Sequence, residues 1–145
     1  METIQVRRIR KQDAASVDRI YASIIQETEH IDFKRIIEEQ TDSPGTVIFV
    51  AELDNEVVGF MISYTILAGF GIDKSAWISM LGVEPKHMGK GIGKKLAQTM
   101  FEFCKEKGIN NIYTSVPWDS TDMLSFFKTL DFDRSNFINL RKTLD

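Results

Sequence analysis

The chain has very little cysteine and histidine. Cys104 is the single cysteine among 145 residues, so an intrachain disulfide is excluded and no C-x-x-C metal or redox motif is present. Two isolated histidines, His30 and His87, cannot build a His-rich metal site. A G-x-S-x-G elbow is also missing. We therefore expect no metal and no covalent relay, and we expect Cys104 to pack on the apolar stripe of a helix.

The chain also lacks a strong excess of charge and a long apolar run. A net charge of −3 argues against general nucleic-acid binding, which depends on many phosphate contacts from Lys and Arg. The N-terminus METIQVRRIRKQD is charged almost from its start, unlike a signal peptide, and no apolar stretch is long enough for a membrane span. With 43% hydrophobic and 27% charged residues, the chain reads as one globular domain, residues 1–145. We expect a cytoplasmic protein with no nucleic-acid or membrane partner.

The most informative stretch is residues 77–96, WISMLGVEPKHMGKGIGKKL. It predicts an apolar strand, a turn at Glu84-Pro85 and then a helix. Three glycines lie between the turn and the helix: Gly89, Gly91 and Gly93. Four lysines add positive charge: Lys86, Lys90, Lys94 and Lys95. Because glycine lets the backbone approach an anion and the first helical N–H groups lack intrahelical partners, this stretch predicts a phosphate or pyrophosphate site.

Two common phosphate loops do not fit this stretch. The Walker pattern G-x-x-x-x-G-K-[ST] would need a glycine at Met88 and a hydroxyl at Lys95, and G-x-G-x-x-G would need a glycine at Lys94. The pattern that is present, V-x-P-x-x-x-G-x-G-I-G-x-x-L from Val83, resembles the central motif of the GNAT superfamily of acetyl-CoA-dependent N-acetyltransferases. The resemblance extends over nearly the whole chain.

The resemblance implies that loop amides hold the pyrophosphate of CoA and that the preceding strand holds the pantetheine arm. The coenzyme-binding residues implied in this chain are Leu81, Gly82, Val83, Met88, Gly89, Lys90, Gly91, Ile92, Gly93, Lys94, Ser120 and Phe127. Met88 stands where the family usually has Arg or Gln. It keeps the backbone N–H and loses the side-chain contacts, which we expect to weaken coenzyme binding without abolishing it.

The order of predicted elements, β-α-α-β-β-β-α-β-α-β, is also the order of the GNAT fold. Strands are predicted at residues 4–9, 46–53, 57–66, 77–83 and 112–116, with a last strand or hairpin over 133–140. Helices are predicted from an Asp13 cap to about residue 26, after Asp32, over 92–107 with Gly108 as C-terminal cap, and from about residue 120. The fold class is α/β (α+β). The resemblance implies a mixed sheet of six to seven strands, splayed between strands 4 and 5 and flanked by about four helices.

The residues for catalysis are less well defined. The resemblance implies a backbone N–H near Leu81 as oxyanion donor, and a tyrosine acid at the position of Phe127, which cannot donate a proton. Tyr113, Tyr64, Ser120 or a water remain as proton donors to the leaving thiolate. Glu29 and His30, on the acceptor side, are the candidate bases, with Glu27 or a water as alternatives. The family's strand glutamate corresponds to Ser79.

The first hypothesis is therefore an N-acetyltransferase that uses acetyl-CoA and a primary amine, by direct attack in a ternary complex. The alternative is a non-catalytic or weakly catalytic CoA-binding module that serves a protein partner through Phe126, Phe127 and Trp118. A nucleic-acid module using the lysines of residues 86–95 is a third reading. The acceptor, small molecule or protein amine, stays open, and so does the choice between monomer and homodimer.

Overall fold

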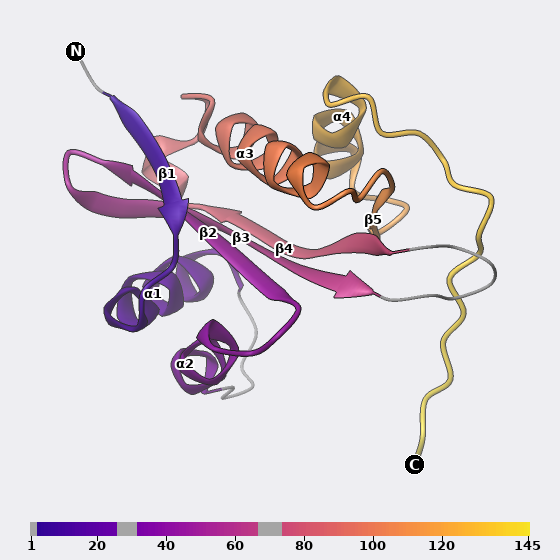
Figure 1. Ribbon diagram of the computed structural model, residues 1–145, viewed down its shortest axis with the longest axis horizontal. Coiled ribbons are helices and arrows are strands. Elements are labelled where there is room, and N and C mark those ends of the chain that lie inside the picture. Colours follow the sequence, from indigo (N-terminus) through magenta and orange to yellow (C-terminus); the bar gives the residue numbers. More distant parts are fainter. Residues whose placement is uncertain (1–2, 26–31, 67–73) are drawn as a thin grey trace.

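The computed structural model describes residues 3–25, 32–66 and 74–145, and it shows one sheet with helices on both faces (Figure 1). Its strands are β1 (Ile4–Arg8), β2 (Thr46–Leu53), β3 (Glu56–Ile66), β4 (Ser75–Val83) and β5 (Ile112–Thr114). Its α-helices are α1 (Ala14–Ile24), α2 (Phe33–Thr41), α3 (Ile92–Glu106) and α4 (Thr121–Thr129). Two short 3-10 helices, η1 (Lys11–Asp13) and η2 (Pro85–His87), precede α1 and the glycine loop.

The sheet follows the order of the chain, β1-β2-β3-β4-β5. The pairs β1–β2, β2–β3 and β3–β4 are antiparallel, and the pair β4–β5 is parallel. The sheet is therefore mixed, as expected. The turn between β2 and β3 is the predicted hairpin: Asp54 and Asn55 both have positive φ, 52° and 65°, as a two-residue hairpin turn requires. Asn and Asp tolerate this conformation better than most residues, which is why the loop can be so short.

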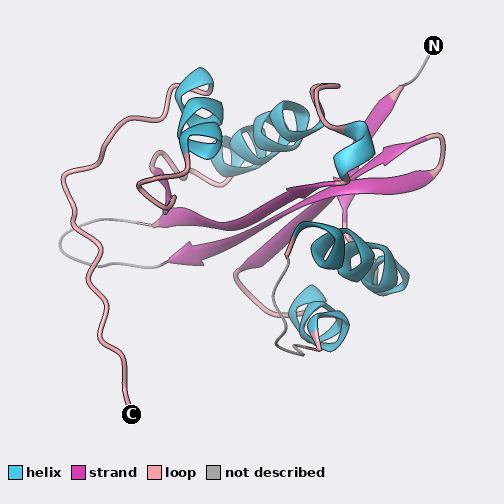
Figure 2. Ribbon diagram, turned by 180° about the vertical axis from the view of Figure 1, so that it is seen from behind, coloured by secondary structure: helices cyan, strands magenta, loops and turns pink. Residues whose placement is uncertain are grey.

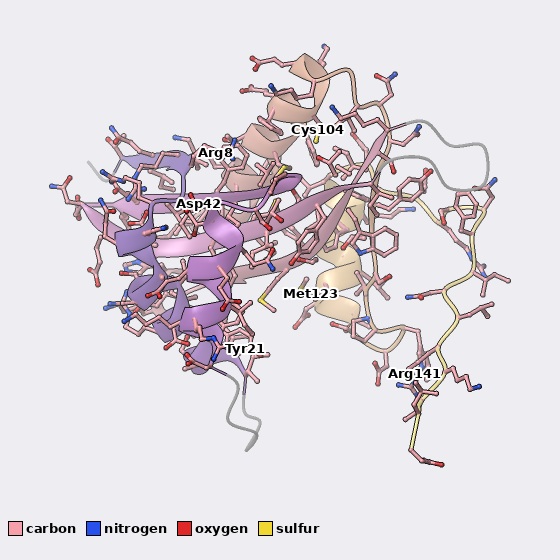
Figure 3. The ribbon with its side chains drawn as sticks, turned by 60° about the horizontal axis from the view of Figure 1, so that its bottom comes forward. Arg8, Tyr21, Asp42, Cys104, Met123 and Arg141 are labelled. Carbon is pink, nitrogen blue, oxygen red and sulfur yellow. The ribbon has the colours of Figure 1, made fainter. Side chains whose placement is uncertain are left out.

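The sheet is covered on both faces. Helices α1 and α2 lie on one face, and α3 and α4 lie on the other (Figures 1 and 2). Side chains of β2 alternate between the two layers: Val47 and Phe49 pack under α3, whereas Ile48 and Val50 pack against α1 and α2. This explains why the strand is a continuous apolar run. Cys104 lies in the α3 layer, 1% exposed, as the sequence predicts (Figure 3).

Six or seven strands were expected, and the described residues form five. The predicted last strand over 133–140 is wrong, because residues 133–145 lie in no helix or strand. Strand β5 is also shorter than the predicted 112–116. A run of β-branched and aromatic residues favours an extended backbone, but a strand also needs a partner ladder. No backbone hydrogen bond joins residues 138–145 to another described residue.

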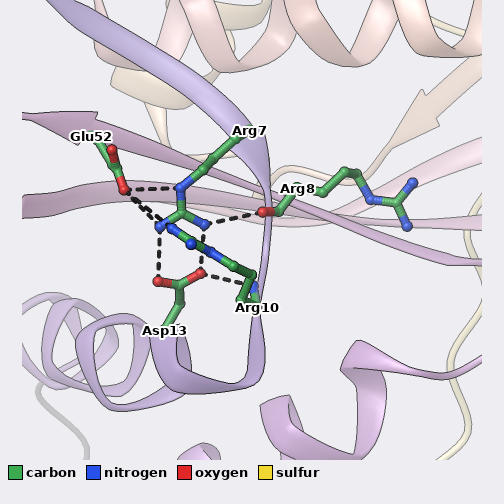
Figure 4. A network of polar contacts seen from close by, with 5 residues as sticks. All are labelled: Arg7, Arg8, Arg10, Asp13 and Glu52. Carbon is green, nitrogen blue, oxygen red and sulfur yellow. Dashed lines mark hydrogen bonds and ion pairs between the residues drawn. The ribbon is translucent and has the colours of Figure 1, made fainter. Parts of the chain in front are cut away.

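Asp13 was predicted to cap α1 and does something different. Its carboxylate accepts two hydrogen bonds from Arg7 of β1, at 2.7 and 2.9 Å, and one from the backbone N–H of Arg10 at 2.8 Å (Figure 4). Arg7 also binds Glu52 of β2, at 2.7 and 2.9 Å. These bonds hold the pKa of Asp13 below its ordinary value and raise that of Arg7, the Asp13–Arg7 hydrogen bonds being the largest cause of both shifts. The Arg7 network therefore ties β1, β2 and the start of α1 together.

Two other helix ends follow the sequence prediction. The carboxylate of Asp32 accepts from the N–H of Arg35 and so caps α2. Gly108 has a φ of +74° just beyond α3, and the N–H of Ile109 reaches back to the carbonyl of Cys104 at 2.8 Å. This six-to-one bond is the Schellman arrangement that glycine favours at a C-terminus.

Candidate coenzyme site on β4 and the glycine loop

The first half of strand β4 is paired with strands on both sides, β3 and β5. Its second half is paired with β3 alone. Residues 76–78 pair with residues 112–114 of β5, and the hydroxyl of Thr114 donates to the carbonyl of Ile78 at 2.9 Å. Beyond Ile78, β4 continues to Val83 against β3, while β5 ends at Thr114. The half of β4 from Ser79 to Val83 therefore has an edge that no described strand pairs. We call it the open edge.

A β-bulge decides which residues of β4 face the open edge. The β3–β4 register shifts between Ile62 and Ser63, which leaves Ser79 as an extra residue on β4. Beyond the bulge, the N–H of Glu84 donates to Val58 of β3 at 2.8 Å. Since successive residues of a strand direct their backbone groups to opposite edges, Gly82 also faces β3, whereas Leu81 and Val83 face the open edge. The backbone groups of Leu81 and Val83 thus lie at an unpaired edge, whereas those of Gly82, which was also predicted to bind the coenzyme, face β3.

The glycine loop follows directly. Gly89 and Gly91 have φ values of +83° and +80°, and a Cβ at either would meet no heavy atom within 4 Å. Gly91 is the residue before α3, whose first turn contributes the N–H groups of Ile92, Gly93 and Lys94. Such first-turn N–H groups have no intrahelical acceptor and lie at the positive end of the helix dipole. The loop is therefore open at Gly89 and Gly91, and its positive-φ glycines before a helix N-terminus are features that anion-binding loops share.

Two further glycines are needed for close packing at the site. A Cβ at Gly93 would lie 3.3 Å from the ring of Phe126 and 3.8 Å from Leu81. This brings the start of α3, the open edge and α4 to one place. On the other face, a Cβ at Gly82 would lie 2.6 Å from the ring of Phe60, which occupies the space that a side chain at this position would fill. Sequence reasoning did not single out Phe126 as a neighbour of the loop, because its position depends on how α4 packs.

The turn between β4 and the loop has its own anchor. Glu84 follows β4 and keeps its backbone bonded to β3. Its Oε2 lies 4.0 Å from Nε2 of His87, and Nδ1 of His87 lies 3.3 Å from Nζ of Lys90. The side chains of Glu84 and His87 are each 17% exposed. Oε2 of Glu84 is buried and has no hydrogen-bond partner among the described residues, so it is the contact of His87 with Lys90 that connects η2 to the start of the glycine loop.

Ser120 and Phe127 lie at helix α4. Ser120 is the residue just before the helix, and its N–H donates to the carbonyl of Pro117. Phe127 is 5% exposed and packs edge-on against Phe126 and Phe132, with ring centroids 5.2 and 5.1 Å apart. The family's tyrosine position is therefore occupied by a core ring in this chain. Asp131, just beyond the end of the helix, adopts a φ of 66°.

The remaining predicted residues are not all brought to the open edge. Tyr113 pairs with Trp77 at the closed half of β4, four positions before Leu81, and its ring lies between Trp77 and Phe137. Ser79 is exposed, and its hydroxyl donates to the carbonyl of Ile62 at 3.3 Å. The candidate bases Glu29 and His30, with Glu27, lie outside the described residues. No group of three or more His, Cys, Asp or Glu side chains suited to a metal occurs in the described part of the chain.

A separate groove lies at the N-terminal end of β2. It is lined by Arg8, Asp42, Phe103 and Lys107 among others, and it includes none of the predicted site residues. None of the described helices is long and apolar enough to cross a membrane.

Comparison with known proteins identifies the family. The family model of the acetyltransferase (GNAT) family matches residues 14–132. Mycothiol acetyltransferase of Renibacterium salmoninarum is 31% identical over 109 residues, which is 74% of this chain and 32% of that protein. The chain belongs to the GNAT acetyltransferase family, as its glycine motif predicts. It spans about a third of the length of this curated relative.

Solved structures agree on the fold. An aminoglycoside acetyltransferase from an uncultured soil metagenomic sample, in complex with sisomicin, superposes with a TM-score of 0.84 at 21% identity, covering 98% of this chain and 97% of that one. An aminoglycoside N-acetyltransferase in complex with CoA superposes with a TM-score of 0.85 at 14% identity, covering 99% and 96%. At these identities the comparison defines the GNAT fold, and the acceptor has to be argued separately.

Proposed function

We propose that this chain is an N-acetyltransferase that transfers the acetyl group of acetyl-CoA to a primary amine. The observation that carries the proposal is the continuity of the open edge with the glycine loop. Leu81 and Val83 offer backbone groups that no described strand uses, and the loop ends on the first turn of α3. A pantetheine arm can pair with the former while the pyrophosphate binds the latter. Family membership and the CoA complex of a structural neighbour support the same reading.

The chain's own groups have separate roles in this proposal. Amides of residues 88–94 hold the diphosphate, and Lys90 and Lys94 add positive charge near it. The N–H of Leu81 stabilises the oxyanion when the amine attacks the thioester directly. A preorganised donor of this kind contributes roughly 3 kcal/mol to the transition state. Because these groups are mostly backbone, the site depends on the bulge and on the glycines more than on particular side chains.

The leaving thiolate has no tyrosine acid at the family position. Phe127 is buried in the core, which leaves Tyr113, Tyr64, Ser120 or a water as proton donors. A thiol pKa of about 8.5 makes the thiolate a tolerable leaving group near neutral pH. General acid catalysis typically contributes about 10²–10⁴-fold, so its loss slows the reaction without preventing it. We propose Glu29 or His30 as the base, with a water as the alternative.

The relatives suggest a small amine as acceptor. Both structural neighbours are aminoglycoside acetyltransferases, and the curated relative acts in mycothiol acetylation by its name. We propose a small molecule with a primary amine as the substrate class. A screen of polyamines, amino acids, aminoglycosides and amino sugars, monitored by free thiol released from acetyl-CoA, tests it. Thiol release with none of these amines, despite CoA binding, would contradict the enzymatic reading.

A CoA-binding module without strong activity is the second candidate. The observation that favours it is the buried Phe127, which removes the family's acid and fills its place with core packing. This candidate shares the coenzyme site and predicts a thermal shift with CoA. It predicts no thiol release over the amine panel. The two experiments together therefore separate an enzyme, a binding module and a chain that binds no CoA.

A further inference from the structure

The groove at the N-terminal end of β2 is lined by cations that have no acidic partner. It has a volume of about 720 Å³ and lies between the C-terminal end of α3 and the turn that joins α2 to β2. Its cationic side chains are those of Arg8, Lys74 and Lys107. None of the three makes an ion pair or a side-chain hydrogen bond with another described residue. Pockets of this size commonly hold small molecules.

Arg8 and its neighbour Arg7 have opposite surroundings. Arg7 is paired with two carboxylates, whereas the side chain of Arg8 extends away from that network (Figure 4). Arg8 lies opposite Phe49 of β2, and its guanidinium carbon is 5.9 Å from the ring centre of Phe49 and 5.5 Å from that of Phe103. An aromatic face attracts the positive charge and accepts no strong hydrogen bond. The five N–H donors of Arg8 therefore remain available for an oxyanion.

Lys107 brings a second positive charge to the same ring. Its Nζ lies 5.8 Å from the ring centre of Phe103, and it follows the last residue of α3. Phe103 is itself held edge-on by Phe49, with ring centres 5.9 Å apart, so the ring forms a fixed floor. Like charges that meet at one ring repel each other, and an anion bound beside them relieves the repulsion.

The lining of the groove is positive in a chain that is negative as a whole. Asp42 is the one carboxylate in the described lining, and it is paired with Lys11 at 3.0 Å. Three cations against one carboxylate give the lining a formal charge of +2, whereas the chain has a net charge of −3. The hydroxyls of Ser43 and Thr65 also line the groove, and neither has a hydrogen-bond partner among the described residues. Charge and donors both favour an anionic ligand.

We propose that this groove is a second binding site, which takes a small organic molecule with a phosphate or carboxylate group. The oxyanion binds Arg8 and Lys107 beside the ring of Phe103. Lys74, next to the start of β4, offers a cation to the far end of the molecule. Because α3 has 15 residues, its C-terminal end is about 22 Å from the glycine loop. Binding in the groove therefore does not require that the chain uses acetyl-CoA.

Thermal unfolding with added anions tests the site. The chain is saturated with CoA to fill the glycine loop, and inorganic phosphate or glutarate is added at an ionic strength matched with sodium chloride. At least one anion should raise the melting temperature saturably beyond the chloride reference. A response to phosphate alone assigns the ligand to the phosphate esters, and a response to glutarate alone assigns it to the carboxylates. No response to either anion would overturn the proposal.

A blocked glycine loop separates this site from the coenzyme site. If the parent chain binds no CoA, the same titrations are made on Gly91→Glu, whose loop repels anions. Failure of the coenzyme proposal then leaves the expected response of the groove unchanged.

Two matched double variants show whether the groove cations carry the response. Arg8→Gln/Lys107→Gln should weaken the apparent affinity for the responding anion roughly tenfold or more, because two charge-assisted contacts are lost. Both side chains are exposed, so the variant should keep its circular dichroism spectrum and its melting response to CoA. Arg35→Gln/Lys105→Gln removes the same charges outside the groove and should bind like the parent. Equal weakening in both double variants would show a general charge effect and overturn the proposal.

Amide chemical shifts locate the bound anion. In the CoA-saturated chain, the responding anion should shift the amide signals of Gly45, Thr46 and Ile109, which line the groove, along one saturable curve. The signals of Gly89 and Gly91 should stay unchanged. Shifts confined to the glycine loop would place the anion in the coenzyme site and overturn the proposal.

Discussion

The two halves of the sheet are built differently. Strands β1, β2 and β3 are joined by antiparallel ladders along their lengths, and the Arg7 network links the first two to the start of α1. Strands β4 and β5 share three residue pairs, and beyond them β4 has its open edge. In the first half only the outer edge of β1 lacks a described strand partner, whereas in the second half β4 has an unpaired edge in the interior of the sheet, from Ser79 to Val83. Stability and coenzyme binding should therefore respond to different substitutions.

Replacement of Arg7 by Leu should have the largest effect on stability. Asp13, whose side chain is 8% exposed, would keep only the N–H of Arg10, and Glu52, 19% exposed, only the guanidinium of Arg10 at 3.7 Å. Breaking a buried ion pair costs about 3–5 kcal/mol, and the remaining contacts place the expected loss at the lower end of that range. Urea unfolding followed by circular dichroism measures the loss. Arg35→Leu, which breaks an exposed pair with Glu39, should change stability by less than about 1 kcal/mol. An equal loss in both variants would show that the Arg7 network has no special role.

Replacement of Gly91 by Glu should have the largest effect on coenzyme binding. A carboxylate in the loop would repel the diphosphate, and the positive φ would strain any side chain there. A CoA concentration of 100 times Kd stabilises a binding protein by about 2.7 kcal/mol, and this shift should vanish in the variant. Gly108→Glu is matched in charge and in φ, +74° against +80°, at the other end of α3. It should lose similar stability and keep the CoA response, and loss of the response in both variants would refute the loop assignment.

Low pH should reduce the free energy of unfolding, because protonation of Asp13 weakens its hydrogen bonds with Arg7 in the first half of the sheet. Its pKa is lowered in the folded state, chiefly by the hydrogen bonds from Arg7, so its contribution is full above the ordinary carboxyl pKa of about 3.9. The contribution is lost as pH falls from there through the lower folded pKa. The effect should be smaller than that of Arg7→Leu, since protonation leaves oxygens that still accept hydrogen bonds. Urea midpoints at pH 7, 4 and 3 measure it, and Asp13→Asn should flatten this arm of the profile.

The smallest predicted effect is a gain in stability on replacement of Asp131 by Gly. Asp131 ends α4 with a φ of 66°, and the N–H of Phe132 bonds to the carbonyl of Phe127 at 3.1 Å in a Schellman arrangement. Glycine adopts this conformation without the strain of about 1–2 kcal/mol that other residues bear, so Asp131→Gly should stabilise the chain by about 1 kcal/mol. Thermal unfolding measures the gain. Asp133→Gly, two residues on and exposed, should give none.

The glycine loop, the Asp54-Asn55 hairpin and the caps at Asp32 and Gly108 could be predicted from sequence, because each depends on a few adjacent residues with special backbone or hydrogen-bonding properties. The role of Asp13 could not, because it depends on Arg7, whose side chain is held between Asp13 and Glu52, a residue distant in the chain. The neighbourhood of Gly93 and Phe126 depends on helix packing in the same way.

The bulge at Ser79 was also hidden from sequence reasoning. A regular alternation counted from Ile78 would direct Met80 and Gly82 to the open edge, in place of Leu81 and Val83. Residues 133–140 show the opposite limit, since Phe137, Ile138 and Leu140 favour a strand that the described chain does not form. In both cases the local preference for an extended backbone was correct. The outcome was decided by pairing with another strand, which local sequence does not determine.

The extra residue at Ser79 also determines how the site tolerates a change in chain length. Because Ser79 matches no residue of β3, its deletion would leave every other pair of that ladder intact. Leu81 and Val83 would keep their orientation, since the neighbours of the gap would resume a simple alternation. One codon can thus be lost from the middle of this strand while Leu81 and Val83 still present their peptide groups to the open edge, where we propose that the coenzyme binds.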